Sequence, residues 1–151
     1  MAPIAFEVHD RATAGAGDGD ATMAVFISLL LFLFGASIAS FAGLAAHRLR
    51  ARPPGRSAWA ALSGRSHCDG CGAQLTALEL VPVLGWLIAG GRCTRCGYHV
   101  PAIYPVSEAL AGAGLVAILL VGGPAALAIA LPTLVVLVVL GVVFLALRGG
   151  G

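Results

Sequence analysis

The sequence SHCDGCG at positions 66–72 is followed 25 residues later by GRCTRCG at positions 91–97. Each segment contains the pattern C-x2-C-G, which supplies Cys68 and Cys71 from the first and Cys93 and Cys96 from the second. Two thiolates separated by two residues can bind one ion from a tight turn, and two such turns complete a tetrahedron. The glycine after each pair permits the positive φ that closes the turn. The pattern therefore predicts a metal site with four thiolate ligands.

Four thiolates favour zinc, with iron as the softer competitor. Because the protein supplies all four ligands, no coordination position is open to water, and we expect a structural ion with no catalytic role. Two other uses of the cysteines are disfavoured. Disulfides would require an oxidising compartment, whereas the arginines place this loop in the cytoplasm, and a thioredoxin-type redox pair would require a βαβ context, which the sequence does not predict. His67 and His99 flank the two cysteine pairs. Either could replace a ligand, but we expect both to lie outside the ligand set.

Two long segments on either side of the cysteines carry no charge. They cover residues 21–46 and residues 109–147. About 20 residues cross a bilayer, whereas one helix of the second length would measure about 58 Å and exceed the bilayer thickness. Gly122, Gly123 and Pro124 interrupt the second segment, which favours a helical hairpin. We predict transmembrane helices at 23–46, 105–121 and 125–147.

Composition supports the same fold class. Hydrophobic residues make up 59% of the chain and charged residues only 11%, against about 25% in soluble domains. Such a chain is neither a soluble globule nor a disordered tail, and it lacks the basic face of a nucleic-acid-binding protein. The sequence predicts an all-α integral membrane protein with three transmembrane helices, a flexible tail at residues 1–22 and a small metal-binding loop at residues 47–104.

Charge placement predicts the orientation. Arginines crowd the end of the first predicted helix, and arginine-rich loops face the cytoplasm. The N-terminus is then expected outside the membrane, with the 47–104 loop and the C-terminus in the cytoplasm. A polybasic lipid-binding patch is a competing use of these arginines, although orientation alone accounts for them.

Two further patterns concern packing. Residues 75–89 are largely apolar but contain Glu79 and Pro82, so this segment is too short and too interrupted to cross a membrane. We expect it to pack within the loop or to lie at the membrane interface. In the first predicted helix, Gly35, Ala39 and Gly43 form a stripe of small residues that lets another helix approach closely.

An ordered set of motifs then resembles a known family, the amino-terminal domain of type IV prepilin peptidases. The motifs are Ser40-Phe41, His47-Arg48-Leu49, Arg65-Ser66-His67-Cys68-x-x-Cys71-Gly72, Val81-Pro82-Val83-Leu84-x-Trp86, Gly91-Arg92-Cys93-x-x-Cys96-Gly97 and Tyr104-Pro105-x-x-Glu108. The resemblance covers about residues 35–112. It implies a location in the bacterial inner membrane, removal of prepilin and pseudopilin leaders, and N-methylation of the new terminus with S-adenosylmethionine. In the family, the zinc loop belongs to the part associated with methylation.

The peptidase half of that family uses two aspartates, which must lie close enough to share a proton and activate water. In this chain aspartate occurs only at positions 10, 18, 20 and 69. We therefore assign no catalytic residue and expect no peptidase activity from this chain alone.

The sequence favours an accessory or split subunit in type IV pilus assembly or type II secretion. Its expected partners are the lipid bilayer, a separate aspartyl peptidase subunit and prepilins. One alternative is a stand-alone pilin N-methyltransferase that uses S-adenosylmethionine. The others are a non-enzymatic membrane scaffold held together by zinc, and a truncated relic of a full peptidase.

Overall fold

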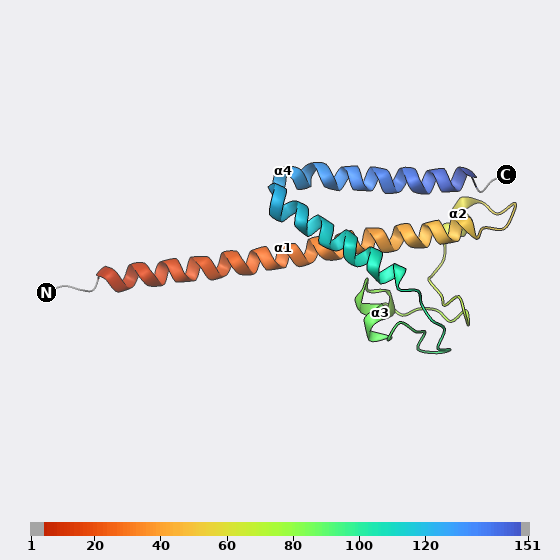
Figure 1. Cartoon of the computed structure of the whole chain (residues 1–151), viewed down its shortest axis with the longest axis horizontal. Coiled ribbons are helices and arrows are strands. Elements are labelled where there is room, and N and C mark those ends of the chain that lie inside the picture. Colours follow the sequence, from red (N-terminus) through yellow and green to blue (C-terminus); the bar gives the residue numbers. More distant parts are fainter. Residues whose placement is uncertain (1–4, 149–151) are drawn as a thin grey trace.

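The computed structural model describes the backbone of residues 5–148 and the side chains of residues 19–148. Along the chain it contains α1 (Ala5–Arg50), α2 (Ala58–Leu62), the 3₁₀ helix η1 (Leu78–Leu80), α3 (Leu84–Ile88) and α4 (Ile103–Arg148). Within the described residues, β-structure is limited to two isolated β-bridges. The protein is all-helical, as the sequence predicts, and its two long helices lie against one another. A lobe that contains α3 lies on one side of them, and α2 lies at the end of α1 (Figure 1).

Helix α1 is longer than the sequence predicts. It begins at Ala5, within the segment expected to be a flexible tail, and residues 1–4 of that segment lie outside the described residues. No proline occurs between Ala5 and Arg50, so nothing in the sequence breaks the backbone hydrogen-bond ladder there. Pro53 and Pro54 follow the last turn, and helices usually end just before a proline.

Helix α4 contains the break predicted at residues 122–124. Gly123 has φ 70° and ψ −173°, a conformation outside the helical region that glycine adopts without steric cost. The chain reverses direction at this point, dividing α4 into a first arm (residues 103–122) and a second arm (residues 124–148), as Figure 1 shows. The ends of the second arm and of α1 are joined by Arg52, whose Nη2 donates a hydrogen bond to the carbonyl oxygen of Ala146 at 3.2 Å.

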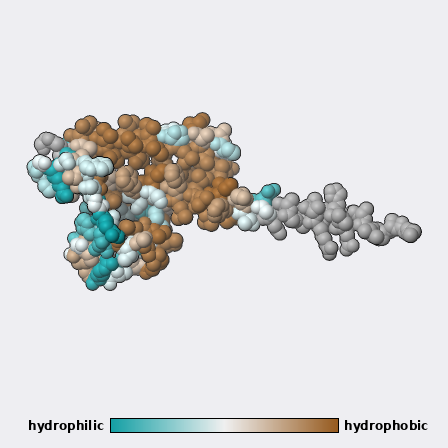
Figure 2. All heavy atoms as spheres, turned by 180° about the vertical axis from the view of Figure 1, so that it is seen from behind, coloured by the Kyte–Doolittle hydropathy of each residue, from teal (hydrophilic) through white to brown (hydrophobic). Residues whose placement is uncertain are grey.

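The two long helices are apolar enough and long enough to cross a membrane. Hydrophobic residues cover their outer surfaces, which form the large brown area in Figure 2. Leu120 and Val121, next to the reversal, are 73% and 90% exposed. Apolar surfaces of this extent mark contact with a membrane or with another protein, so these helices are suited to a lipid environment.

The first arm crosses α1 at two glycines. A Cβ atom on Gly35 would lie 2.7 Å from the carbonyl oxygen of Ala111, and one on Gly112 would lie 2.6 Å from that of Phe32. Ala36, beside this crossing, is fully buried. The close approach predicted from the small-residue stripe of α1 is therefore made within the chain, because only a hydrogen at these positions lets the two backbones meet.

We expect Gly112→Ala to weaken this crossing, because its new methyl group would clash with the backbone and ring of Phe32. The predicted loss of stability is about 1–3 kcal/mol, the usual cost of overpacking. Gly114→Ala is the matched control, because a Cβ atom there meets nothing within 4 Å. Thermal unfolding of the purified chain in detergent should separate the two variants, and equal midpoints would contradict this packing.

Candidate metal centre

The two cysteine motifs fold into hairpins with the same hydrogen bonds, displaced by 25 residues. In the first, Cys68 N–H donates to Ala73 O, and Gly72 N–H donates to Cys68 O, both at 2.9 Å. In the second, Cys93 N–H donates to Tyr98 O at 2.8 Å, and Gly97 N–H donates to Cys93 O at 2.9 Å. We call these the first knuckle (residues 66–75) and the second knuckle (residues 91–100). The internal repeat in the sequence is thus a repeat in structure.

Glycine closes each knuckle for the reason that the sequence indicates. Gly72 and Gly97 have φ values of 69° and 72°, which are unfavourable for residues with a Cβ atom. The isolated bridges also match, since one pairs His67 with Gln74 and the other pairs Arg92 with His99.

The four predicted cysteines meet at the junction of the two knuckles. Their sulfur atoms all lie within 4.8 Å of one another, and Cys68 Sγ lies 3.8 Å from Cys96 Sγ. A tetrahedral zinc ion with Zn–S bonds of about 2.3 Å requires sulfur atoms about 3.8 Å apart, so the spacing fits such an ion. Cys68 and Cys93 are buried while Cys71 and Cys96 are exposed, so each knuckle contributes one inner and one outer thiol.

Backbone N–H groups point at these sulfurs. Gly70 N–H donates to Cys68 Sγ at 3.3 Å. The backbone N–H groups of Arg95 and Cys96 lower the pKa of Cys93 to about 6, because they stabilise its thiolate. For Cys96, the Tyr98 N–H also favours the thiolate, but partial desolvation of its sulfur and the neighbouring thiols outweigh it and raise the pKa to about 12. A cation bound among the sulfurs would stabilise their thiolate forms.

Side chains beyond the ligands lock the two knuckles together. A Cβ atom on Gly70 would lie 2.8 Å from the side chain of Tyr98, so Tyr98 of the second knuckle packs directly on the turn of the first. Trp86 Nε1 donates to Val100 O at 2.9 Å, and its ring occupies the space that a Cβ atom on Gly91 would need. The segment between the knuckles therefore packs on the second knuckle, as expected for residues 75–89.

Glu79 attaches the same segment to the second knuckle through its carboxylate. Its Oε2 accepts hydrogen bonds from the backbone and hydroxyl of Thr76 at 2.8 and 2.9 Å, and its Oε1 accepts one from the Thr94 hydroxyl at 2.9 Å. Arg95 Nη2 lies 3.7 Å from Oε2. These partners, with the Thr76 backbone N–H as the strongest, lower the pKa of Glu79.

A buried carboxylate from α4 fixes the other end of the segment. Glu108 is buried, and its Oε2 accepts a hydrogen bond from Val83 N–H at 2.7 Å. Val83 has φ 63° and ψ −53°, and Leu84 N–H donates to Pro82 O at 2.7 Å. This is a γ-turn of the rare, strained kind, and a β-branched residue at positive φ persists only where its surroundings hold it. The sequence places Glu108 in a family motif but does not show that its partner is Val83.

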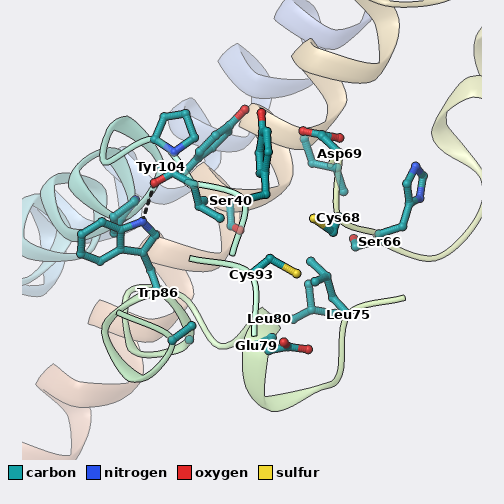
Figure 3. A pocket seen from close by; sticks show the side chains of 18 of the residues that line it. Ser40, Ser66, Cys68, Asp69, Leu75, Glu79, Leu80, Trp86, Cys93 and Tyr104 are labelled. Atoms are coloured by element: carbon teal, nitrogen blue, oxygen red, sulfur yellow. Dashed lines mark hydrogen bonds between the residues drawn. The ribbon is translucent and has the colours of Figure 1, made fainter. Parts of the chain in front are cut away.

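A cavity of about 250 Å³ lies between the knuckles and the crossing of α1 with the first arm. Cys68 and Cys93 point toward one another at its edge, with Trp86 and Tyr104 on the side of the helices (Figure 3). Its polar lining includes Ser40, His47, Ser66, Asp69, Glu79 and Glu108. The sulfur cluster and the start of the first arm therefore border the same cavity.

The two histidines beside the knuckles lie outside the sulfur cluster. Both are exposed, and the potential ligand group contains only the four cysteines among the described residues. His67 Nδ1 lies 3.3 Å from Arg65 O.

Comparison with known proteins gives one family. Residues 33–121 match the model of the bacterial peptidase A24 N-terminal domain, and this segment contains both knuckles and the crossing of α1 with the first arm. No solved structure matches the chain.

Curated relatives carry the name prepilin leader peptidase/N-methyltransferase. The chain is 33% identical to the Bacillus subtilis protein over 79 residues, which cover 52% of this chain and 29% of the relative. It is 41% identical to the Burkholderia pseudomallei protein over 66 residues, covering 44% of this chain and 21% of the relative. The match to the Aeromonas salmonicida protein is 32% over 100 residues, covering 54% and 34%. The chain thus spans about a third or less of the length of these relatives.

We expect Glu79→Gln to loosen the segment between the knuckles at neutral pH, because an amide accepts these hydrogen bonds more weakly than a carboxylate does. The pKa of Glu79 is lowered from 4.5 in the folded protein, so its advantage over glutamine is complete above about pH 4.5. The advantage disappears as the pH falls through the lowered value.

Limited proteolysis of the full chain in detergent measures this effect. The variant should be cleaved several times faster than the parent protein at neutral pH, and the two rates should converge in acid. Comparing the two proteins at each pH cancels the protonation of the cysteines. A rate ratio that is independent of pH would contradict this role of the carboxylate.

Proposed function

This chain belongs to the family of bacterial peptidase A24 N-terminal domains, and on that premise we propose that it is a membrane module with a structural zinc site that acts in prepilin or pseudopilin leader processing or N-methylation. The observation that carries the proposal is the position of the four-sulfur cluster, which lies wholly inside the segment that matches the family. The relatives' name supplies the substrate class, a prepilin.

The proposed placement is in the bacterial inner membrane with three spans. Helix α1 crosses over residues 23–46, and the arms of α4 cross over residues 105–121 and 125–147. The apolar outer surfaces of these helices and the reversal at Gly123 support this placement. The arginines at the end of α1 support a cytoplasmic 47–104 loop, with the N-terminus outside and the C-terminus inside.

Zinc is the proposed ion because four converging cysteine sulfurs with tetrahedral spacing form a closed, soft ligand set. Cys68, Cys71, Cys93 and Cys96 would hold it, and its contribution would be to stabilise the loop. Such sites supply on the order of 10 kcal/mol to folding.

The chemistry of leader processing needs a different set of groups. The 151 residues contain aspartate only at positions 10, 18, 20 and 69, and Asp69 lies in the first knuckle. We propose that the two peptidase carboxylates come from outside these residues, and that this module positions a prepilin or the peptidase beside the cavity under the metal centre.

We expect Cys68→Ser and Cys96→Ser each to release the metal and to make the loop sensitive to protease, because three thiolates do not complete the tetrahedron. Elemental analysis of the purified chain should give one zinc per chain for the parent protein and much less for both variants. His67→Ala is the control, since its ring lies outside the sulfur cluster, and it should retain the metal. Full metal content in both cysteine variants would contradict the four-thiolate site.

Deletion of the coding sequence should cause pilins to accumulate with an uncleaved leader or an unmethylated N-terminus. Mass spectrometry of the pilins measures both products. Complementation with the parent chain should restore them, whereas complementation with Cys68→Ser should not. Normally processed and methylated pilins in the deletion strain would contradict the proposal.

Two further measurements distinguish the roles. Co-purification with a membrane protein that supplies the two peptidase aspartates would favour the split-subunit role. Calorimetric binding of S-adenosylmethionine to the purified chain alone would instead favour a stand-alone methyltransferase.

A further inference from the structure

A second cavity, of about 400 Å³, lies at the end of α1 and is lined by no cysteine. We call it the basic pocket, because its lining includes Arg48, Arg52, Arg56 and Arg65. His47 and His67 also line it, and Asp69 is the single carboxylate among its lining residues. Four guanidinium groups facing one space repel each other unless an anion neutralises them.

Arg48 is the structural member of this group. Its Nη1 donates to the carbonyl oxygens of Leu62 and Gly64 at 3.0 and 3.3 Å, and its Nη2 donates to that of Arg65 at 3.1 Å. These acceptors engage both terminal nitrogens of Arg48 and position the segment after α2. They are neutral, however, so the charge of Arg48 still acts on the pocket.

The other arginines have unused donors. Arg52 Nη2 donates to Ala146 O, but Arg52 Nε is buried without a hydrogen-bond partner. The side chains of Arg56 and Arg65 form no hydrogen bond or ion pair with the described part of the chain. A buried donor without a partner is costly, so the pocket is incomplete without an acceptor.

The position of the pocket indicates where that acceptor comes from. The charge-free segment of α1 ends at Ala46, immediately before the pocket residues His47 and Arg48, and apolar Leu44 forms one wall. The hydrogen bond from Arg52 places the end of the second arm at the same level. The guanidinium groups therefore lie where the apolar surfaces of both helices stop, which is the depth of lipid headgroups for helices of this kind.

We infer that the basic pocket binds a phosphate group, and that its source is the headgroup of an acidic phospholipid. The planar guanidinium of arginine can donate two parallel hydrogen bonds to two oxygens of one phosphate, and basic pockets between membrane helices on the cytoplasmic side hold anionic headgroups. The site uses none of the cysteines and is independent of any processing or methylation activity.

The test is calorimetric titration of the full chain in neutral detergent with dioctanoyl-phosphatidylglycerol. Dioctanoyl-phosphatidylcholine and inorganic phosphate are titrated in parallel. Arg52→Gln and Arg56→Gln should each weaken phosphatidylglycerol binding about tenfold, the effect of losing one charge-assisted hydrogen bond. Arg50→Gln is the matched control, because it removes the same charge from the end of α1 at a residue that does not line the pocket.

Arg56→Gln also keeps the test valid if Arg52→Gln disturbs folding, because the Arg56 side chain bonds to nothing in the described chain. Binding of phosphatidylglycerol, but not phosphatidylcholine, with dependence on Arg52 and Arg56 supports the inference. Inorganic phosphate binding equally well, with the same dependence, would overturn the lipid as the source. An equal loss in Arg50→Gln, or no binding of either anion, would overturn the site itself.

Discussion

The convergence of four sulfur atoms within 4.8 Å is the constraint on which the loop between the long helices depends. Buried hydrophobic residues elsewhere lie in α1 and α4, whereas in the described loop the buried ones are Cys68 and Cys93 themselves. A segment of this size buries too little apolar surface to offset its conformational entropy. The thiols therefore replace a hydrophobic core, and an ion bound to them would provide the cohesion that packing provides in larger domains.

The rest of the lobe is attached to this centre in a sequence of contacts. Tyr98 joins the knuckles, Trp86 and Glu79 attach the intervening segment to the second knuckle, and Glu108 connects that segment to α4. The strained turn at Val83 lies between the attachment at Glu79 and the hydrogen bond to Glu108. The sulfur cluster is thus connected to α4 by a few hydrogen bonds and ring contacts rather than by a continuous apolar core.

Local patterns in the sequence were sufficient for part of this structure. The C-x2-C-G repeat predicts two matching tight turns, and Gly122–Pro124 predicts the reversal, because short-range backbone chemistry decides both. The segment predicted as a tail, residues 1–22, is helical from Ala5 onward, and no proline interrupts it there. No local pattern in the sequence predicts the turn at Val83 or the position of the Arg52 side chain. Val83 is hydrogen-bonded to Glu108 and Arg52 to Ala146, and both partners lie far along the chain.

The division of the cysteines into inner and outer thiols has a kinetic consequence. Cys68 and Cys93 form the closed floor of the centre, whereas Cys71 and Cys96 form an edge that faces solvent. A chelator or a metal-donating protein could attack along that edge and exchange ligands one at a time, leaving the floor intact. An ion held there would therefore be reached from solvent through Cys71 and Cys96 before Cys68 and Cys93.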